Sequence, residues 1–382
     1  MRPTILASFV FLAAGLFQAG AQTQATVTLE RHATSNALDG PVELFDWYST
    51  LRGTVEMSFS GDDGSVKLGL DANAILHDSY DFEDDASIAA TAVVSRKLSS
   101  RIELRGTFSL KHASEGDDLL LGPLIVPIRT DTTTVSAAGE AGIDLGGNYV
   151  LLLTAGASRD DVGPSRLPGG LKAAFEADTT RLVAATALQH TNGKSMTGGE
   201  IQWRGVRPAL TGGAVVAFGS DEIALKAELR RTLAHDIEVR LVAGAGLFVA
   251  TDLPLEIVRP LYDMALKIPL GRAELRANIV ARFDTADTDD PLGSYVQRGE
   301  IEAGYRLAER LAVGAGLFVE LKDNFLIGYD ERSWGVYSEA SWTLSPRLGL
   351  LFRIEHDRTE LEGIGISERT ADVFVRLSAR TS

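Results

Sequence analysis

Cysteine is absent from all 382 residues of the sequence, which excludes disulfide bridges and thiolate metal sites. Beyond residue 21 there is no run of about 18 or more apolar residues, so membrane-spanning helices are not expected. The formal net charge is −15 and no basic patch offsets it, which argues against a nucleic-acid partner. The phosphate-binding patterns GxGxxG and GxxxxGK(S/T) are missing as well, so we expect no nucleotide and no other cofactor.

The N-terminus has the features of a targeting segment. Arg2 provides a positive charge, residues 5–16 (ILASFVFLAAGL) are apolar but too short to span a bilayer as a helix, and Ala19-Gly20-Ala21 matches an A-x-A cleavage site. We expect a secretory signal peptide at residues 1–21, cleaved after Ala21, with an apolar first strand or an anchor as the alternative. Residues 22–382 contain no linker or shift in composition, so we expect them to form one repetitive domain.

A short turn motif recurs along this domain, each time between stretches in which apolar and polar residues alternate. The copies are Lys97–Arg101 (KLSSR), Thr232–Asp236 (TLAHD), Arg306–Arg310 (RLAER) and Thr343–Arg347 (TLSPR). The segments that follow two of them are nearly identical, RLVAGAGLFV at 240–249 and RLAVGAGLFV at 310–319. Tight turns between segments of period two predict β-hairpins, and hence an array of hairpins from end to end.

Each predicted strand has one apolar face and one charged face. In residues 273–284, for example, Ala, Leu, Ile and Phe side chains alternate with Glu274, Arg276, Asn278, Arg282 and Asp284. The same division holds for residues 102–111, 223–230 and 294–306. Two environments accept this pattern: a soluble β-sandwich with its apolar faces inward, and a membrane barrel with its apolar faces outward and a wet interior.

Strand length and composition favour the membrane barrel. The strands run about 9 to 13 residues, which a tilted strand needs to cross a bilayer, whereas globular strands average about five or six. Alanine and glycine on the apolar face would fill a thick sandwich core poorly. Trp334 and Trp342 lie on the apolar face of one strand, roughly 26 Å apart along it, so we expect one indole at each membrane interface.

The connections are also asymmetric. Short turns are predicted at 61–64, 145–148, 178–180 and 270–272, and longer, mostly acidic loops at 77–87, 113–131, 160–170, 284–293 and 356–368. Tight turns at one end and long loops at the other are typical of barrels in outer membranes, whereas a sandwich has no reason to keep this asymmetry.

From about Ala25 to its end, the chain resembles the Gram-negative outer-membrane β-barrel proteins as a class. The resemblance implies an all-β fold, a transmembrane antiparallel up-and-down barrel, located in the outer membrane. It also implies outer-membrane lipid, lipopolysaccharide and the barrel-assembly machinery as partners. The chain departs from the class at its end, because Phe374 lies inside the last strand and no aromatic residue stands at the C-terminus.

We expect 16 to 20 strands, with twenty (ten hairpins) as the preferred assignment and both termini in the periplasm. The least certain strands are those near Lys172–Glu176 and Gly199–Arg204, so sixteen and eighteen remain alternatives. At this size the lumen is too wide for side chains alone to fill it.

Two loops are candidates for special roles. The centre of residues 113–131 is apolar and twice interrupted by proline, and Leu119, Leu120, Leu124 and Ile125 could fold inward as a constriction or pack at the outer rim. A calcium site at Asp287, Asp289 and Asp290 is disfavoured because the spacing lacks a defined ligand pattern.

Charged side chains of the predicted lumen face are the candidates for selectivity. They are Glu274, Arg276, Arg282, Arg298, Glu300, Glu302 and Arg306. We expect them to form cross-strand ion pairs that hold the wall, with a transverse field that orients a polar solute as the alternative.

Catalysis is not expected. The stretch from Gln189 to Ser195 is loosely similar to the His-x-Ser-Asn stretch of outer-membrane acyl hydrolases, but His190 and Thr191 are adjacent and point to opposite faces. The other histidines suggest no metal site.

The function that we expect is a passive or weakly selective pore for small polar solutes. The alternatives are an export or assembly barrel for a polysaccharide or protein that works with periplasmic partners, a non-conducting surface-binding barrel and, least of all, an acyl hydrolase. No feature of the sequence indicates an oligomeric state.

Overall fold

The computed structural model describes residues 22–37, 44–121, 124–175, 177–209, 218–285, 292–326, 329–363 and 365–381. The predicted signal peptide and the acidic group Asp287, Asp289 and Asp290 lie outside these residues. Within them, no helix combines the length and the hydropathy that a membrane span needs.

Strands make up most of the described chain, joined by short turns and three short 3-10 helices. The strands are β1 (Gln22–Thr34), β2 (Asp46–Gly61), β3 (Gly64–His77), β4 (Asp85–Ser99), β5 (Ile102–Leu121), β6 (Leu124–Gly146), β7 (Tyr149–Val162), β8 (Ser165–Arg166), β9 (Lys172–Ala173), β10 (Thr179–Asn192), β11 (Ser195–Pro208), β12 (Ser220–Thr232), β13 (Glu238–Ala250), β14 (Glu256–Leu270), β15 (Ala273–Thr285), β16 (Gly293–Ala308), β17 (Leu311–Asn324), β18 (Asp330–Ser345), β19 (Leu348–Glu362) and β20 (Ile366–Arg380). The 3-10 helices are η1 (Asp81–Glu83), η2 (Pro168–Gly170) and η3 (Ala234–Asp236).

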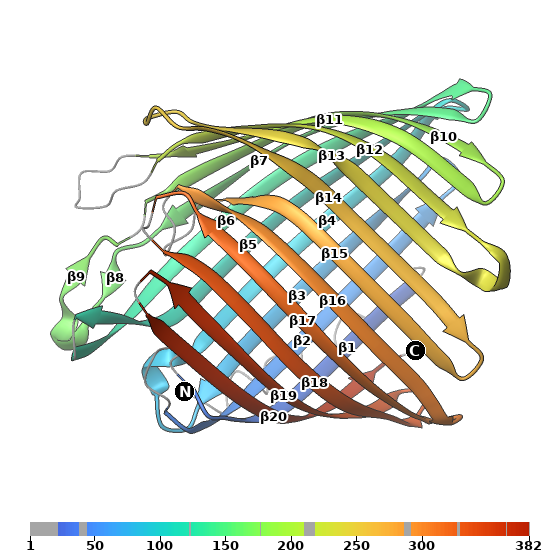
Figure 1. The fold of residues 1–382 in the computed structure, drawn as a ribbon. Coiled ribbons are helices and arrows are strands. Elements are labelled where there is room, and N and C mark those ends of the chain that lie inside the picture. The colour runs from blue at the N-terminus through green and yellow to red at the C-terminus, as the bar shows by residue number, and fades with distance from the viewer. Residues whose placement is uncertain are drawn as a thin grey trace.

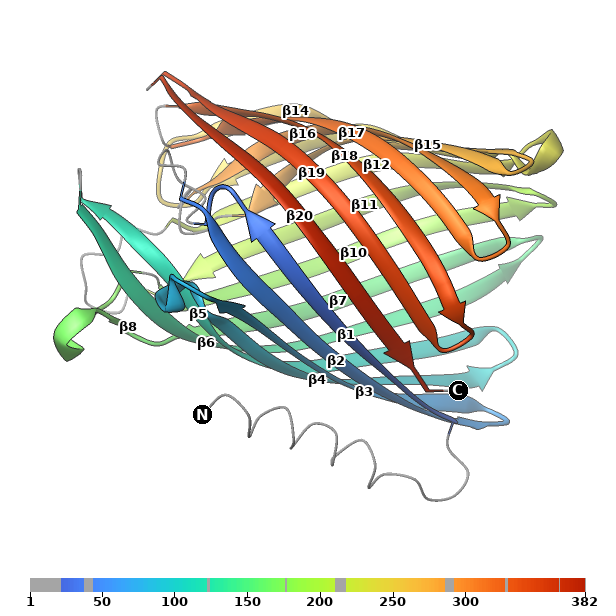
Figure 2. The ribbon, with the colours of Figure 1, turned by 90° about the horizontal axis from the view of Figure 1, so that it is seen from below.

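The strands form a closed antiparallel barrel of eighteen strands, with β8 and β9 as an extra pair outside the wall (Figures 1 and 2). Each wall strand pairs with its neighbour in sequence, and β7 pairs with β10 past the extra pair. The barrel closes between β1 and β20, which pair from Thr26 with Arg380 to Thr34 with Asp372. The predicted fold class is therefore confirmed.

The preferred assignment of twenty wall strands is corrected to eighteen, a number within the predicted range. Lys172 and Ala173 form a two-residue strand that pairs with β8 in the connection after β7, so the segment does not reach across the wall. Gly199–Arg204, the other uncertain segment, lies in the middle of the full-length wall strand β11.

The period-two pattern places apolar side chains on the outside of the barrel. Phe108, Leu225 and Ile279 point outward and are 50%, 61% and 49% exposed. Trp334 and Trp342 lie on the same outer face of β18, toward its two ends, and are 40% and 51% exposed. Because successive residues of a strand point to opposite faces, the intervening polar residues face the lumen.

The two ends of the barrel differ as expected. All four copies of the recurring turn lie at the end that also holds the start of β1 and the end of β20. The connection at 145–148 is similarly tight, and Gly146, Gly147 and Asn148 take positive φ angles of 80°, 61° and 69° there. We call this the turn end and the opposite end the loop end.

Three predicted connections are wrong. Residues 113–131, predicted as a loop, are mostly strand, because β5 runs to Leu121 and β6 begins at Leu124. Residues 178–180 are not a turn, because Thr179 and Thr180 begin β10 at the loop end. The loop at 356–368 is mostly strand, since β19 runs to Glu362 and β20 begins at Ile366. Polar residues in these strands face the lumen or lie beyond the apolar belt, so their composition resembles that of a loop.

Candidate functional site: the charged lumen wall

The seven predicted lumen charges lie together on the inner faces of β15 and β16. Arg276 reaches two carboxylates, Glu274 at 2.5 Å on its own strand and Glu302 at 3.8 Å on the next. Arg298 lies 3.7 Å from Glu300. Of these contacts, only that between Arg276 and Glu302 crosses from one strand to the next, and the other two join residues two positions apart on the same strand.

The remaining members of this group lie at the ends of the network. Arg282 pairs with Asp284 at 3.1 Å toward the loop end, and Arg306 lies at the turn end of β16, opposite Ala312. Arg298 also bonds to Glu320 on β17 at 3.3 Å. The group therefore forms several separate ion pairs on neighbouring strands, and its role in selecting solutes remains a prediction.

Ion pairs extend across β11 to β14, further than the predicted group. Arg240 lies between Glu228 (3.4 Å) and Asp263 (3.0 Å), so it joins β12, β13 and β14. Lys226 contacts Glu200 on β11 at 3.4 Å. The alternating pattern of these strands carries the signal for such residues, but only register, which the sequence does not specify, shows which charges meet.

A row of hydroxyl groups lies on another part of the wall. Thr91, Ser109, Ser136 and Ser158 are directly opposite one another in register across β4, β5, β6 and β7. Ser109 lies between Phe108 and Leu110, which are 50% and 43% exposed on the outside, so this row of hydroxyls faces the lumen. Ion pairs face the lumen beyond this row too, such as Arg353 with Glu339 on β19 and β18 and Arg376 with Glu30 on β20 and β1.

Two pockets lie along the inner faces of β10 to β16. One of about 590 Å³ is bordered by Arg230, Arg240, Lys267, Arg276 and Glu302, among others. A second of about 340 Å³, lined by Gln189, Glu200, Lys226, Asp263 and Arg282 among others, lies between β10 and β15. In both linings cationic side chains outnumber carboxylates, although the whole chain is acidic.

A row of stacked rings crosses the closing seam near the loop end. Phe374, His32, Tyr48 and His77 face one another in register on β20, β1, β2 and β3. The ring centroids are 4.6, 4.3 and 5.0 Å apart in that order. The sequence analysis treats these histidines as scattered, because only barrel closure brings β20 beside β1.

Carboxylates surround the two imidazoles of this row. His32 contacts Glu30 and Asp372, each at 2.9 Å, and Arg376 donates to Glu30 at 2.7 Å. His77 lies 3.2 Å from the buried Asp46. The seam is thereby held by side chains as well as by backbone hydrogen bonds.

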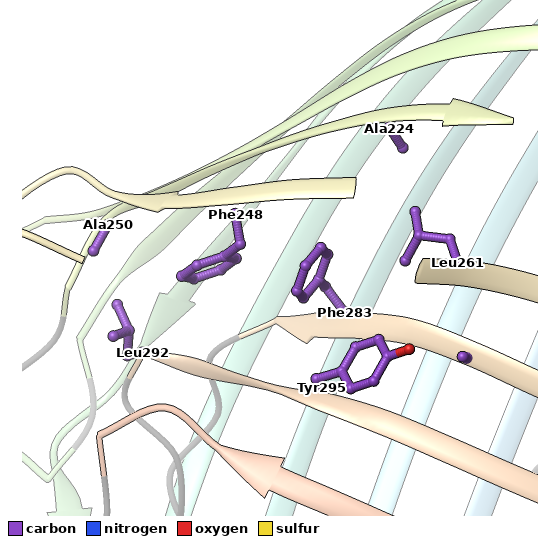
Figure 3. Packing of buried hydrophobic residues seen from close by; sticks show 8 residues of the cluster. Ala224, Phe248, Ala250, Leu261, Phe283, Leu292 and Tyr295 are labelled. Atoms are coloured by element: carbon purple, nitrogen blue, oxygen red, sulfur yellow. The ribbon is translucent and has the colours of Figure 1, made fainter. Parts of the chain in front are cut away.

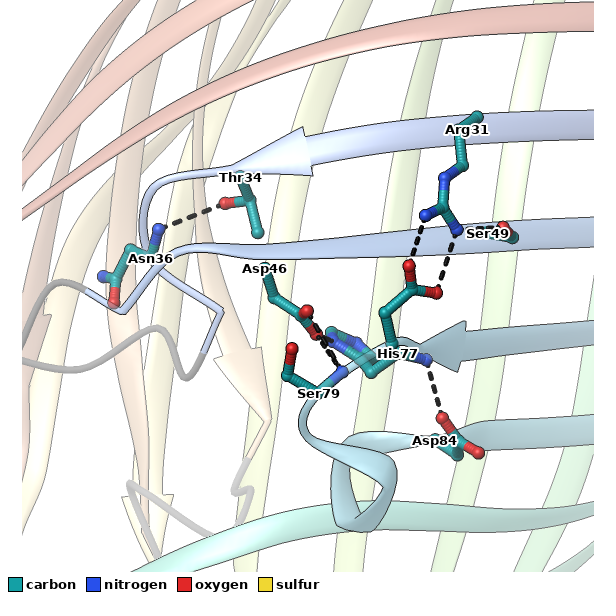
Figure 4. Close-up of polar contacts among 9 residues, drawn as sticks. Arg31, Thr34, Asn36, Asp46, Ser49, His77, Ser79 and Asp84 are labelled. Carbon is teal, nitrogen blue, oxygen red and sulfur yellow. Dashed lines mark hydrogen bonds and ion pairs between the residues drawn. The ribbon is translucent and has the colours of Figure 1, made fainter.

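Asp46 anchors the loop after β3 (Figure 4). The Ser79 backbone N–H donates to its carboxylate at 3.1 Å (Figure 4). Burial raises the pKa of Asp46, but hydrogen bonds from Ser79, Trp47 and His77 outweigh burial, so the net pKa is lowered. On the outer face nearby, Arg31 donates to Asp78, whose backbone N–H bonds to Trp47.

The apolar segment proposed as a constriction continues a hairpin. Leu119 pairs with Val126 and Leu120 with Ile125, and Leu124 begins β6 opposite Leu121. The strands beside this hairpin end earlier, because β4 pairs with β5 only up to Ser114 and β7 with β6 only from Thr132. The side chains of residues 117–125 lie outside the described part of the structure, so the choice between constriction and rim remains open.

His190 packs its ring against Tyr149, with centroids 4.4 Å apart. Among the described residues, no group of three or more His, Cys, Asp or Glu side chains is arranged to hold a metal ion.

Comparison with known proteins shows which solved structures share this fold. No known family and no curated protein matches the sequence. Among solved structures, the chain is similar to the copper transporter OprC (TM-score 0.55, 10% identity, covering 96% of this chain and 81% of that one). It is also similar to Pseudomonas aeruginosa OccK2 (OpdF) in complex with glucuronate (TM-score 0.53, 11% identity, covering 95% and 98%). The chain therefore has the fold of the outer-membrane β-barrel proteins.

Proposed function

We propose that the protein is an outer-membrane pore that lets small polar solutes pass, with weak selectivity. The observation that carries this proposal is the closed eighteen-strand wall, apolar outside and lined inside by ion pairs and hydroxyls. Barrels of 16 to 18 strands enclose a lumen that side chains do not fill. A polar lining lowers the cost for a hydrated solute to leave bulk water.

The similar structures support transport as the class of function. OprC is described as a copper transporter, and OccK2 was solved with glucuronate, so both concern small charged solutes. We extend from them only the idea of a small polar solute, and we include no enzymatic activity in the proposal. Outer-membrane lipid, lipopolysaccharide on the acidic loop end and the barrel-assembly machinery are the partners that this location requires.

Liposome swelling tests the proposal. Purified, refolded protein is reconstituted into liposomes, which are then diluted into isosmotic solutions of neutral sugars of increasing size. The proposal predicts rapid swelling with small sugars that falls off with solute size, and no swelling with heat-denatured protein. Swelling no faster than that of protein-free liposomes, from a barrel shown to be folded by heat-modifiable gel mobility, would favour a plugged export barrel or a surface-binding barrel.

A further inference from the structure

The wall of the barrel is incomplete between β14 and β15. The last pair of this ladder toward the loop end is Tyr262 with Ala281. Beyond it, β14 continues to Glu256, paired with β13 alone, and β15 continues to Thr285, paired with β16 alone. In Figure 1 the two ribbons run together at the turn end and separate toward the loop end.

Pro260 explains where the ladder stops. The Tyr295 hydroxyl donates to the Pro260 carbonyl at 2.6 Å, so this carbonyl points toward β15 and β16. The N–H and C=O of one strand residue point toward the same neighbour, and proline has no N–H to donate. The edge of β14 that faces β15 therefore lacks a donor just beyond the last pair.

On the loop-end side of the last β14–β15 pair, the ends of β15, β16 and β17 pass inside the barrel. Phe283, Tyr295 and Asp323 belong to the face that points outward nearer the turn end, where Ile279 and Leu321 are 49% and 40% exposed. Here the same face meets the inner face of β13 and β14.

Three contacts define this packing. The rings of Phe283 and Phe248 lie 5.6 Å apart, Arg259 pairs with Asp323 at 2.8 Å, and the Arg259 guanidinium lies 5.8 Å from the centre of the Tyr295 ring. Figure 3 shows Phe248, Phe283 and Tyr295 gathered between the two sets of strands. We call these residues, with Leu261 and Leu292, the latch.

The latch is an apolar core inside a polar lumen. Phe248, Phe283 and Tyr295 are 3%, 2% and 3% exposed. Val296, on the opposite face of β16 from Tyr295, is also only 3% exposed, so this end of β16 is buried on both faces. A wall strand of a pore needs no such core. The ends of β15, β16 and β17 fill part of the cross-section that would otherwise be open lumen.

The sequence also fits a second arrangement. Continuing the register beyond Tyr262 and Ala281 would bring Arg259 opposite Asp284, an opposite-charge pair on the inner face. Phe283 would then lie opposite Pro260 on the outer face, where the other apolar side chains of these strands lie. We call the arrangement in the structure tucked and the arrangement with the continued ladder zipped. The two arrangements give the same side chains different partners.

We propose that the tucked ends of β15, β16 and β17 are a movable constriction of the pore, held closed by the latch and released when they zip onto β14. The inference rests on the proposed pore and names the element that controls its open area. It assigns the constriction to these strand ends rather than to the apolar hairpin at residues 119–125.

Conductance tests the constriction. Phe248→Ala removes the ring that β13, which keeps its place in the wall, contributes to the latch. Because Phe248 is buried, its removal does not by itself widen the open lumen. We expect Phe248→Ala to show a larger conductance step or a several-fold greater open fraction than the wild type in planar bilayers. Phe108→Ala, which removes an outward-facing ring from β5, is the matched control and should conduct as the wild type does.

A disulfide tests the movement without relying on current. The chain has no native cysteine, so Arg259→Cys with Asp284→Cys introduces a single pair, which the zipped arrangement would bring directly opposite each other. As a pair without mutual backbone hydrogen bonds, these residues would have Cα atoms about 4.5 Å apart, within disulfide range. Leu241→Cys with Met264→Cys, partners in the intact β13–β14 ladder, is the positive control.

We expect peptides 259 and 284 to be linked in non-reducing tryptic digests analysed by mass spectrometry, and reduction to change the conductance. If they stay unlinked while the control pair is linked, or if Phe248→Ala conducts as the wild type does, the proposal is overturned. A wild type and a Phe248→Ala variant that both carry no current would refute the pore and the constriction together. A linked 259–284 pair would then still show that the strand ends move, so the two failures are distinguishable.

Discussion

At the scale of single residues, the repeated GAG segment has a physical explanation. Gly246 and Gly316 occupy equivalent places in the two copies, and in each case an aromatic ring lies where a Cβ atom would be. The ring over Gly246 is Phe283, part of the latch, and the ring over Gly316 is Tyr337, whose hydroxyl donates to Glu302. At these two positions, glycine therefore leaves the space that an aromatic ring on the lumen side of the wall occupies.

Gly316→Val should destabilise the barrel because the new side chain displaces the Tyr337 ring and breaks its hydrogen bond to Glu302. We expect a loss of about 1–3 kcal/mol in the free energy of unfolding, typical of overpacking. Urea unfolding followed by heat-modifiable mobility measures this loss. Gly299→Val is the matched control, since nothing lies within 4 Å of a Cβ at Gly299, and an equal loss there would contradict the explanation.

Asp46 gives a prediction for pH. Its carboxylate lies at the start of β2 at the loop end, beyond Trp47, and its pKa is lowered in the folded state. A lowered folded pKa contributes stability that is present above the unfolded value of about 3.9 and is lost as pH falls through the folded pKa. Unfolding midpoints should therefore drop below about pH 4 in the wild type.

Asp46→Asn should lower the midpoint at neutral pH by removing hydrogen bonds to a charged acceptor, worth about 1.5–3 kcal/mol. It should also flatten the acid dependence, as followed by intrinsic fluorescence during urea unfolding. An unchanged acid dependence in Asp46→Asn would show that other carboxylates are responsible.

At the scale of elements, the apolar hairpin of β5 and β6 and the tucked ends of β15 to β17 make opposite predictions. The hairpin is paired with itself beyond its neighbours, whereas the tucked ends pack across the inner wall. Deleting residues 119–126 should therefore leave single-channel conductance close to that of the wild type. A large rise in conductance after this deletion would show that the hairpin, and not the ends of β15 to β17, is the constriction.

How much the sequence predicts also differs between elements. The recurring turns and the alternation fix the hairpins of β4–β5, β12–β13, β16–β17 and β18–β19, because local sequence alone determines them. Long-range packing determines the rest. Phe283 and Tyr295 follow the outward pattern in sequence and are buried inside in the structure, and only the contact with Phe248 on another hairpin reveals this.

At the scale of the whole molecule, the lumen is lined by charges of both signs. Ion pairs line β11 to β16 and also β18 to β20 and β1, and a row of hydroxyl groups lies on β4 to β7. Charges fixed on the wall act on a passing ion over roughly 8–10 Å at physiological ionic strength. Selectivity is therefore expected to be weak, and to depend on salt.

Arg240→Gln tests this arrangement, because it leaves Glu228 and Asp263 without their shared cation. We expect the reversal potential in a salt gradient to move toward greater cation preference, and the shift to shrink at high salt. Arg101→Gln, the same charge change in the exposed β4–β5 turn, is the control. An equal shift in both variants would show that net charge, and not the lumen wall, sets the preference.

The central claim, that the closed barrel is a pore, is tested most directly by single-channel recording of the refolded protein in a planar bilayer. Heat-modifiable gel mobility shows beforehand that the barrel has formed. The account predicts stable, discrete current steps. A folded barrel that inserts into the bilayer and carries no current, with the latch intact and with it weakened by Phe248→Ala, would contradict it.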